Sequence, residues 1–283
     1  MLLLGKNIAN SLLQTYQKTL LTLPRSPHLV AILIGDHPAS HTYVAMKEKA
    51  CTQVGMRSSV IKLEASISLL TLLQRIDQLN EDPLVDGILI QLPLPPHLDP
   101  TLVMQHLDPS KDVDGFHPLN MGKLLLGQSD GFVPCTPLGI QTLLNESKIS
   151  LAGQHVVIVG RSSIVGKPLA ALLVQKHPQA NATVTLAHSH SRNLFELTAT
   201  ADVLVAALGH PRFIKAHAVK QGAVVIDVGI TREQGKLVGD VDFEEVAPKC
   251  RAITPVPGGV GPMTVAMLVH NTLVSCQRRC KNY

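Results

Sequence analysis

The chain has 283 residues, of which 45% are hydrophobic and 16% charged, and its formal net charge is +4. This length is enough for two domains with a core each, and the composition is that of a globular protein rather than a disordered or fibrous one. The slightly basic charge is compatible with anionic small ligands. No block of lysine and arginine and no basic stripe interleaved with aromatic residues is present, so we expect no binding of nucleic acid.

Short aliphatic runs alternate with longer amphipathic patterns through the first part of the chain. The predicted strands are 29–34, 58–63 and 85–91, and the predicted helices are 6–21, 40–55 and 68–80. A passage rich in proline and glycine, 115–137, interrupts this alternation, and we place a domain junction there.

A second set of strands and helices follows the junction. Its predicted strands are 156–159, 183–187, 203–207, 224–228 and 252–256, and a last helix is predicted from Thr264 to about Arg279. Strands that alternate with helices predict an α/β fold with parallel sheets. We therefore expect two α/β domains, residues 1–137 and 138–263, followed by a helix over 264–283 that could pack on either domain.

The five cysteines are scattered and form no Cys-x-x-Cys pair, which is typical of a reducing compartment. Cys276 and Cys280, four residues apart at the end of a helical pattern, could form a metal pair, but without a third ligand we interpret them as inert and predict no metal site. No signal peptide is recognisable, and no apolar run reaches membrane-spanning length. We expect a cytoplasmic protein with no membrane association.

Residues 254–264 hold three prolines and three glycines between a predicted strand and a predicted helix. Proline fixes the backbone, and glycine lets another molecule approach it closely, so this composition predicts a rigid loop of specific shape. Ligands of open α/β sheets bind beyond the carboxyl ends of strands. We predict a ligand-binding loop here; the alternative is an ordinary turn from strand to helix.

The second domain begins with a strand, a glycine turn and the start of a helix, residues 155–168. Gly160 and Gly166 take the first and last glycine positions of a dinucleotide fingerprint with one extra residue between them, and Ser162 stands where the middle glycine is usual. The pattern favours a dinucleotide site. Such turns also occur in α/β proteins that bind no nucleotide.

The end of the next predicted strand distinguishes between the two nicotinamide cofactors. An NAD site generally places a carboxylate there for the ribose 2′-hydroxyl, and residues 188–192 contain none. Ser189, together with Arg161 in the first turn, suits a 2′-phosphate, because a guanidinium binds phosphate oxygens in pairs. We predict NADP rather than NAD; the alternative is that Arg161 is a solvated turn residue and Ser189 a turn former.

In the first domain, Tyr43 and Lys47 are four residues apart and share one face of a predicted helix. A phenol can position a ring, and a lysine whose pKa is lowered by burial or by a neighbouring cation can act as a general acid or base. Exposed Tyr and Lys at this spacing are also commonplace, so the pair alone is a weak signal.

Two further polar positions end apolar segments of the first domain. Gln91 stands at the carboxyl end of a predicted strand, where polar groups of α/β proteins face a ligand, and Asp114 precedes the domain junction. Each has a structural alternative, since Gln91 could cap the strand and Asp114 could form a turn with Gly115. Lys47, Gln91 and Asp114 together form a metal-free set for acid/base catalysis and hydrogen bonding.

These motifs together resemble those of bifunctional methylenetetrahydrofolate dehydrogenase/methenyltetrahydrofolate cyclohydrolase, the FolD family. The resemblance runs nearly end to end and is specific. It rests on Leu4-Gly5-Lys6, Pro38-Ala39-Ser40, Tyr43-x-x-x-Lys47, Gln91-Leu92-Pro93-Leu94-Pro95, Lys111-Asp112-Val113-Asp114-Gly115-Phe116, Gly160-Arg161-Ser162, Ile164-Val165-Gly166, Ile226-Asp227-Val228-Gly229-Ile230 and the loop 254–264.

The resemblance implies a homodimer in which each chain has a folate-binding first domain, an NADP-binding Rossmann domain, a catalytic cleft between them and a last helix that returns to the first domain. Tyr43 would stack on the pterin, Lys47 would be the principal acid/base of the cyclohydrolase, Gln91 would tune Lys47, and Asp114 would hold the polar edge of the pterin. The implied NADP contacts are Gly160, Arg161, Ser162, Ser189 and Ile230, and the implied cleft residues are Pro257, Gly258, Gly261 and Thr264.

Three other functions share part of this pattern. A short-chain dehydrogenase also uses Tyr-x-x-x-Lys, but there the pair follows the dinucleotide turn, whereas here it precedes it. A nucleotide-sensing protein without catalysis is disfavoured because the set of Lys47, Gln91 and Asp114 is intact. An enzyme with only one of the two activities stays open, and the sequence gives no role for Cys135 or His117.

Overall fold

The structure of the protein is a computed structural model that describes residues 1–280. The chain divides into two compact units. The first unit comprises Asn10–Cys135 and the chain from Val265 onward, and the second comprises Met1–Ala9 and Thr136–Thr264. The last three residues of the helix predicted over 264–283 lie outside the described residues.

The first nine residues group with the second unit, although the sequence places them with the first domain. The reason is backbone pairing with a strand of the second unit. The amide of Leu3 donates to the carbonyl of Ile253 at 2.9 Å, and the amide of Ile253 donates to the carbonyl of Met1 at 3.0 Å. The division after Cys135 lies two residues from the predicted boundary at 137.

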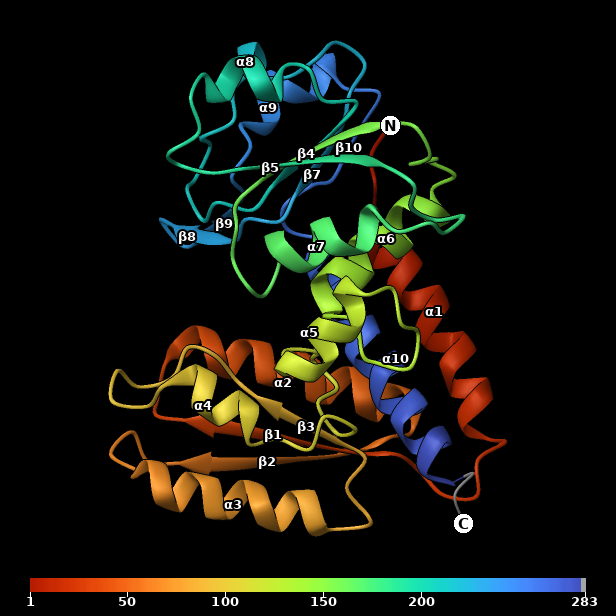
Figure 1. The fold of residues 1–283 in the computed structure, drawn as a ribbon, viewed down its shortest axis with the longest axis vertical. Helices are drawn as coiled ribbons and strands as arrows, with labels where there is room; N and C mark the ends of the chain where they lie inside the picture. Colours follow the sequence, from red (N-terminus) through yellow and green to blue (C-terminus); the bar gives the residue numbers. More distant parts are fainter. Residues whose placement is uncertain (281–283) are drawn as a thin grey trace. The chain divides into compact units, whose positions relative to one another are not determined.

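A parallel three-stranded sheet in the order β2-β1-β3 forms the centre of the first unit. Its strands are β1 (His28–Ile34), β2 (Arg57–Leu63) and β3 (Gly87–Ile90). Helices α2 (Pro38–Val54) and α3 (Leu69–Glu81) cover opposite sides of the sheet (Figure 1). Every residue of β1 and β3 is buried, as expected of parallel strands with helices on both faces.

Four further helices contribute to the first unit, two of them in part: α1 (Gly5–Leu20), α4 (Pro100–Gln105), α5 (Pro118–Leu125) and α10 (Val260–Cys280). The later part of α10 is attached to the segments around β3. The Ser275 hydroxyl donates to the carbonyl of Asp86 at 2.7 Å and to that of Ser110 at 2.9 Å.

The second unit contains a parallel five-stranded sheet in the order β10-β7-β6-β4-β5. Its strands are β4 (His155–Val159), β5 (Thr183–Ala187), β6 (Val203–Ala206), β7 (Val224–Asp227) and β10 (Ala252–Ile253). Helices α6 (Cys135–Glu146) and α7 (Gly166–Leu173) lie on one side of this sheet, and α8 (Leu194–Thr198) and α9 (Phe243–Val246) on the other (Figure 1). An antiparallel hairpin, β8 (Thr231–Glu233) with β9 (Lys236–Val238), and the short 3-10 helices η1 (Ala216–Ala218) and η2 (Ala247–Lys249) complete it.

Three of the differences from the sequence-based expectation have a local cause. The passage 115–137, expected as a junction, contains α5, which starts because Pro118 is tolerated at a first helical position and His117 Nδ1 accepts the amide of Leu119 at 3.0 Å. Strand β10 ends at Ile253, three residues early, before the first proline of the loop. Helix α10 begins at Val260 rather than at Thr264, because Pro262 falls in the first turn, where its missing N–H costs nothing.

Both units are thus α/β layers built on parallel sheets. No helix within residues 1–280 combines the length and the apolar character needed to cross a lipid bilayer.

Candidate functional site

Lys47 and Gln91 meet in the first unit. Lys47 lies on α2, and Gln91 follows β3 directly, where its amide donates to the carbonyl of Ile32 on β1 at 2.9 Å. Lys47 Nζ donates to Gln91 Oε1 at 3.1 Å, and Gln91 Nε2 donates to the carbonyl of Leu92 at 2.8 Å. The side-chain amide is therefore held from both ends, with its oxygen toward the ammonium.

Tyr43 lies one turn before Lys47 on the same face of α2 and is half-buried. Burial raises the pKa of the Tyr43 phenol above its ordinary value of 10.0. The phenol therefore stays protonated at neutral pH and serves as a ring surface and a hydrogen-bonding group rather than as a base.

The two carboxylates of the predicted motif have different environments. Asp112 is buried, and its carboxylate accepts the amides of Gly115, Phe116 and His117 at 3.2, 3.2 and 2.8 Å and the side-chain amide of Asn120 at 2.8 Å. Burial raises the pKa of Asp112, and the bond from Asn120 opposes that shift. Asp112 thus organises its loop.

Asp114 is held in place by the loop that Asp112 organises, and it is partly exposed. The loop is tight at Gly115, which has a φ of 80° and packs so closely on Val133 and Pro134 that a β-carbon would lie 2.7 Å from the Pro134 nitrogen. Between the two acids, Asp114 is therefore the one available to a ligand.

Cys135 is a buried thiol near the predicted catalytic residues, and no role for it was predicted from the sequence. Its Sγ donates to the carbonyl of Val113 at 3.3 Å, and the carboxylate of Asp114 lies within electrostatic reach of it. Burial raises the pKa of the Cys135 thiol well above 9.0; the charge of Asp114 adds to this shift and the charge of Lys47 opposes it. Lys47 and Asp114 are thus both within electrostatic reach of one thiol, and of the predicted set Lys47 and Gln91 are in direct contact.

Asn271 of α10 holds the backbone segments around Cys135 in place. Its Nδ2 donates to the carbonyls of Val113 and Val133 at 2.9 and 3.1 Å and lies 3.7 Å from Cys135 Sγ. Sequence reasoning missed Asn271, because an asparagine inside a helical pattern gives no signal of its distant partners. The sequence also left His117 open, and the structure places it as the N-cap of α5.

The glycine turn after β4 is packed so closely that only glycine fits at two positions. A β-carbon on Gly160, where φ is 126°, would overlap the carbonyl oxygen of Ala207, and one on Gly166 would overlap that of Gly160. The turn therefore brings the start of α7 directly against the strand end, which is the geometry in which helix amides reach a phosphate.

Arg161, Ser162 and Ser189 surround this turn and are exposed. Ser162 Oγ accepts the amides of Val165 and Gly166 at 3.1 and 3.4 Å, so it caps the start of α7. Strands β4 and β5 are neighbours, and the amide of Gly160 donates to the carbonyl of Ala187 at 2.9 Å. The turns that carry Arg161 and Ser189 thus leave adjacent strand ends.

The proline- and glycine-rich loop is fixed by contacts within the second unit. Thr254 Oγ1 accepts the amide of Asp227 at 2.8 Å, and the carbonyl of Gly258 accepts the amide of Lys6 at 3.0 Å. The peptide bond before Pro257 is cis, and Gly258 has a φ of 104°. The loop is thus tied at Thr254 and at Gly258 to other segments of the second unit, and its rigidity and ligand binding stay predictions.

Ile230 and Gly261 come together beside this loop, because a β-carbon on Gly261 would lie 3.7 Å from Cδ1 of Ile230. Thr264 Oγ1 lies 3.0 Å from Thr136 Oγ1, which joins the start of α10 to α6. These residues and those around Gly160 form two groups within the second unit.

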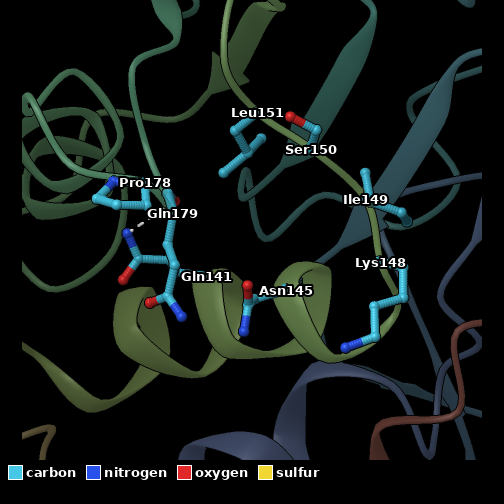
Figure 2. Close-up of a pocket in the computed structure, with 8 residues that line it drawn as sticks. All are labelled: Gln141, Asn145, Lys148, Ile149, Ser150, Leu151, Pro178 and Gln179. Carbon is cyan, nitrogen blue, oxygen red and sulfur yellow. Dashed lines mark hydrogen bonds between the residues drawn. The ribbon is translucent and has the colours of Figure 1, made fainter.

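Two surface pockets of the second unit, of about 310 and 240 Å³, contain none of the predicted site residues. Figure 2 shows the larger one, between α6 and the segments that carry Ser150 and Gln179. The linings of both include residues just before β4, Leu151 in the larger and Gln154 in the smaller, at the amino ends of the strands. A dinucleotide is expected at the opposite, carboxyl ends.

Comparison with known families assigns both parts of the chain. Residues 3–114 match the catalytic domain of tetrahydrofolate dehydrogenase/cyclohydrolase, and residues 134–280 match the NAD(P)-binding domain of the same enzymes. The chain belongs to the tetrahydrofolate dehydrogenase/cyclohydrolase family. The predicted family, the two-domain α/β fold and the use of a nicotinamide dinucleotide are thereby confirmed.

Individual relatives agree with this family along nearly their full length. The bifunctional protein FolD of Chlamydia pneumoniae is 55% identical over 278 residues, which cover 96% of this chain and 97% of the relative. The crystal structure of the bifunctional FolD enzyme of Campylobacter jejuni is 46% identical, with a TM-score of 0.95 and 99% of each chain covered. The FolD of Trypanosoma brucei, solved with NADP and an inhibitor, is 35% identical, with a TM-score of 0.92 and coverage of 98% of this chain and 97% of that one. The protein is a dehydrogenase and a cyclohydrolase of folate one-carbon metabolism.

Proposed function

We propose that Lys47, Gln91, Asp114 and Tyr43 carry the chemistry by which this enzyme oxidises 5,10-methylenetetrahydrofolate with NADP and hydrolyses the 5,10-methenyl product to 10-formyltetrahydrofolate. The observation that carries the proposal is the hydrogen bond from Lys47 Nζ to Gln91 Oε1, in the part of the chain that matches the family's catalytic domain. Lys47 and Asp114 both lie within electrostatic reach of the buried Cys135 thiol.

The hydrolytic step needs a group that both removes and returns a proton. Water adds to the methenyl carbon and loses a proton. The bond from that carbon to one folate nitrogen then breaks as the nitrogen gains a proton, and the hydroxyl on the carbon gives up its remaining proton to solvent, which leaves the formyl group. Lys47 can serve both transfers in turn: the lone pair of its neutral amine takes the proton from water, and the ammonium that results gives a proton to the folate nitrogen, while a hydrogen-bond acceptor holds the amine in place. Gln91 Oε1 is that acceptor.

The oxidative step needs orientation more than a base. A hydride leaves the methylene carbon for the nicotinamide, and the two flanking folate nitrogens share the positive charge that results. Tyr43, which stays protonated, would stack on the pterin, and Asp114 would accept N–H groups at its polar edge.

For the dinucleotide we propose contacts at Gly160, Arg161, Ser162, Ser189 and Ile230, and a cleft lining that includes Pro257, Gly258, Gly261 and Thr264. The packed glycine turn, with the exposed residues 161–164 just before α7, fits a pyrophosphate, and Arg161 with Ser189 on adjacent strand ends fits a 2′-phosphate. The Trypanosoma brucei relative, which was solved with NADP, supports this choice over NAD.

We also propose that residues 1–137 with the last helix bind folate, that 138–263 bind NADP, and that the enzyme works as a homodimer in the cytoplasm. The five free thiols in the described part of the chain support a reducing compartment. The homodimer rests on the family resemblance alone.

The test supplies purified protein with methylenetetrahydrofolate and either NADP or NAD, and follows reduced nicotinamide. A second assay follows the decay of separately supplied methenyltetrahydrofolate. We expect reduction with NADP preferred and accelerated methenyl decay. Activity in one assay alone would show a monofunctional enzyme, and silence in both from folded protein that binds the ligands would show that the motifs serve binding only.

A further inference from the structure

The last turn of α10 carries two thiols in contact. Cys276 Sγ and Cys280 Sγ lie 3.8 Å apart, because residues four positions apart share one face of a helix. Cys276 is fully buried, and Cys280 is partly exposed. The spacing alone indicated inert thiols, and the contact between their sulfur atoms changes that interpretation.

The surroundings of the pair include a guanidinium. Arg25 binds Asp86 through two hydrogen bonds of 2.6 Å and lies within electrostatic reach of both thiols. The thiolate, not the thiol, is the form that attacks disulfides. Burial raises the pKa of Cys276 to about 12, and the charge of Asp86 adds to this shift. The partly exposed Cys280 is therefore the thiol that an external reagent meets.

We propose that Cys276 and Cys280 are a redox-active dithiol, which a low-molecular-weight disulfide of the glutathione type oxidises to a disulfide within α10. The Cys280 thiolate attacks one sulfur of the reagent, so that a mixed disulfide forms and one reagent thiol leaves. Cys276 then gives up its proton and attacks Cys280 Sγ, which forms the protein disulfide and releases the second reagent thiol. The two cysteines lose two hydrogens in total, and the reagent gains them.

The helix geometry also predicts how easily the disulfide is reduced. Helix positions four apart hold their β-carbons about 5–6 Å from each other, whereas a disulfide needs roughly 3.5–4.5 Å. The last turn of α10 must tighten when the bond forms. Strained disulfides have more oxidising potentials and are easily reduced, so we expect a reversible bond.

The experiment incubates the reduced full-length protein with excess oxidised glutathione and measures intact mass and cysteine-containing peptides. The expected product is a protein that has lost two hydrogens, with Cys276 and Cys280 joined in one peptide, and dithiothreitol restores the starting mass. A Cys250→Ser variant is the matched control, because Cys250 is also partly exposed but is not part of the pair. This variant should form the disulfide between Cys276 and Cys280 to the same extent as the parent protein.

Two further variants test whether Cys280 reacts with glutathione first and Cys276 displaces the glutathione afterwards. Cys276→Ser should retain one glutathione on Cys280, because the resolving thiol is gone, and Cys280→Ser should leave Cys276 unmodified. Cys276→Ala replaces Cys276→Ser if the buried serine prevents folding, as judged by circular dichroism. A parent protein that keeps a stable glutathione adduct on Cys280, or that keeps both thiols reduced, would overturn the proposal.

Discussion

Lys47 Nζ donates to Gln91 Oε1 at 3.1 Å across 44 residues of sequence. The contact exists because α2 packs on β1, and β1 pairs with β3, whose carboxyl end carries Gln91. Lys47 and Gln91, which are distant in the sequence, thus form one hydrogen-bonded unit, and the first prediction rests on this unit.

Replacing Lys47 by alanine should abolish most of the cyclohydrolase activity. General acid–base catalysis contributes about 100-fold to 10,000-fold to a rate, so we expect methenyltetrahydrofolate hydrolysis to fall by at least about 100-fold. The dehydrogenase should fall much less, because hydride transfer needs no strong base there. Both rates are measured on the same preparation by the two assays described above.

Lys49 provides the control, since it is an exposed lysine on the same helix, two residues further along. Lys49→Ala should leave both rates near those of the parent. A Lys47→Ala protein that hydrolysed at the parental rate would make Lys47 a binding residue only.

Asp112 and Asp114 should respond differently to the same substitution. Asp112→Asn puts N–H groups opposite several amide donors in a buried site, and we expect a loss of about 2–4 kcal/mol in unfolding free energy. Asp114→Asn should leave the unfolding free energy nearly unchanged and raise KM for the folate substrate. Chemical denaturation and initial rates measure the two effects, and equal destabilisation by both variants would refute the division of roles.

The sequence predicted the strands of both sheets well, because aliphatic runs bounded by glycine, proline and polar residues leave few alternatives. Strand β5 was predicted at its observed bounds, and β4 to within one residue. The hairpin of β8 and β9 was not predicted. Its strands are three residues long and largely exposed, and the signal was only the Gln234-Gly235 turn, where both residues have positive φ.

The candidate site was predictable residue by residue but not as an arrangement. Lys47, Gln91 and Asp114 are polar groups at helix faces and strand or loop ends, which sequence patterns can find. The roles of Asp112 and Cys135 could not be found that way. The role of Asp112 depends on which backbone amides turn toward its carboxylate, and that of Cys135 depends on its burial near Asp114. Tertiary packing determines both.

Arg161→Ala should weaken the enzyme's preference for NADP over NAD. A hydrogen bond to a charged group contributes about 1.5–3 kcal/mol, so the ratio of kcat/KM for the two dinucleotides should fall by roughly 10-fold to 100-fold. Lys176→Ala is the matched control, because Lys176 is exposed beyond the opposite end of α7. Steady-state rates with both dinucleotides measure the ratio, and an unchanged ratio for Arg161→Ala would place the phosphate elsewhere.

Asp227 should make the stability of the second unit depend on pH. Its carboxylate accepts the amides of Gly229, Asp240 and Val241, yet burial, together with the charge of Asp240, raises the pKa of Asp227 to about 7. The raised pKa means that the folded form holds the proton more tightly than the unfolded chain, where an aspartate has a pKa of about 3.9.

The contribution of Asp227 to folding is therefore full below about pH 4 and is lost as the pH rises through about 7. At 1.36 kcal/mol per pH unit, this loss is at most about 4 kcal/mol. We expect the unfolding free energy of the parent to fall between pH 5 and 8 by more than that of Asp227→Asn, which cannot ionise at this position. Urea denaturation of both proteins at several pH values measures the difference. Parallel curves would show that Asp227 keeps an ordinary pKa, because its three amide donors would then outweigh its burial.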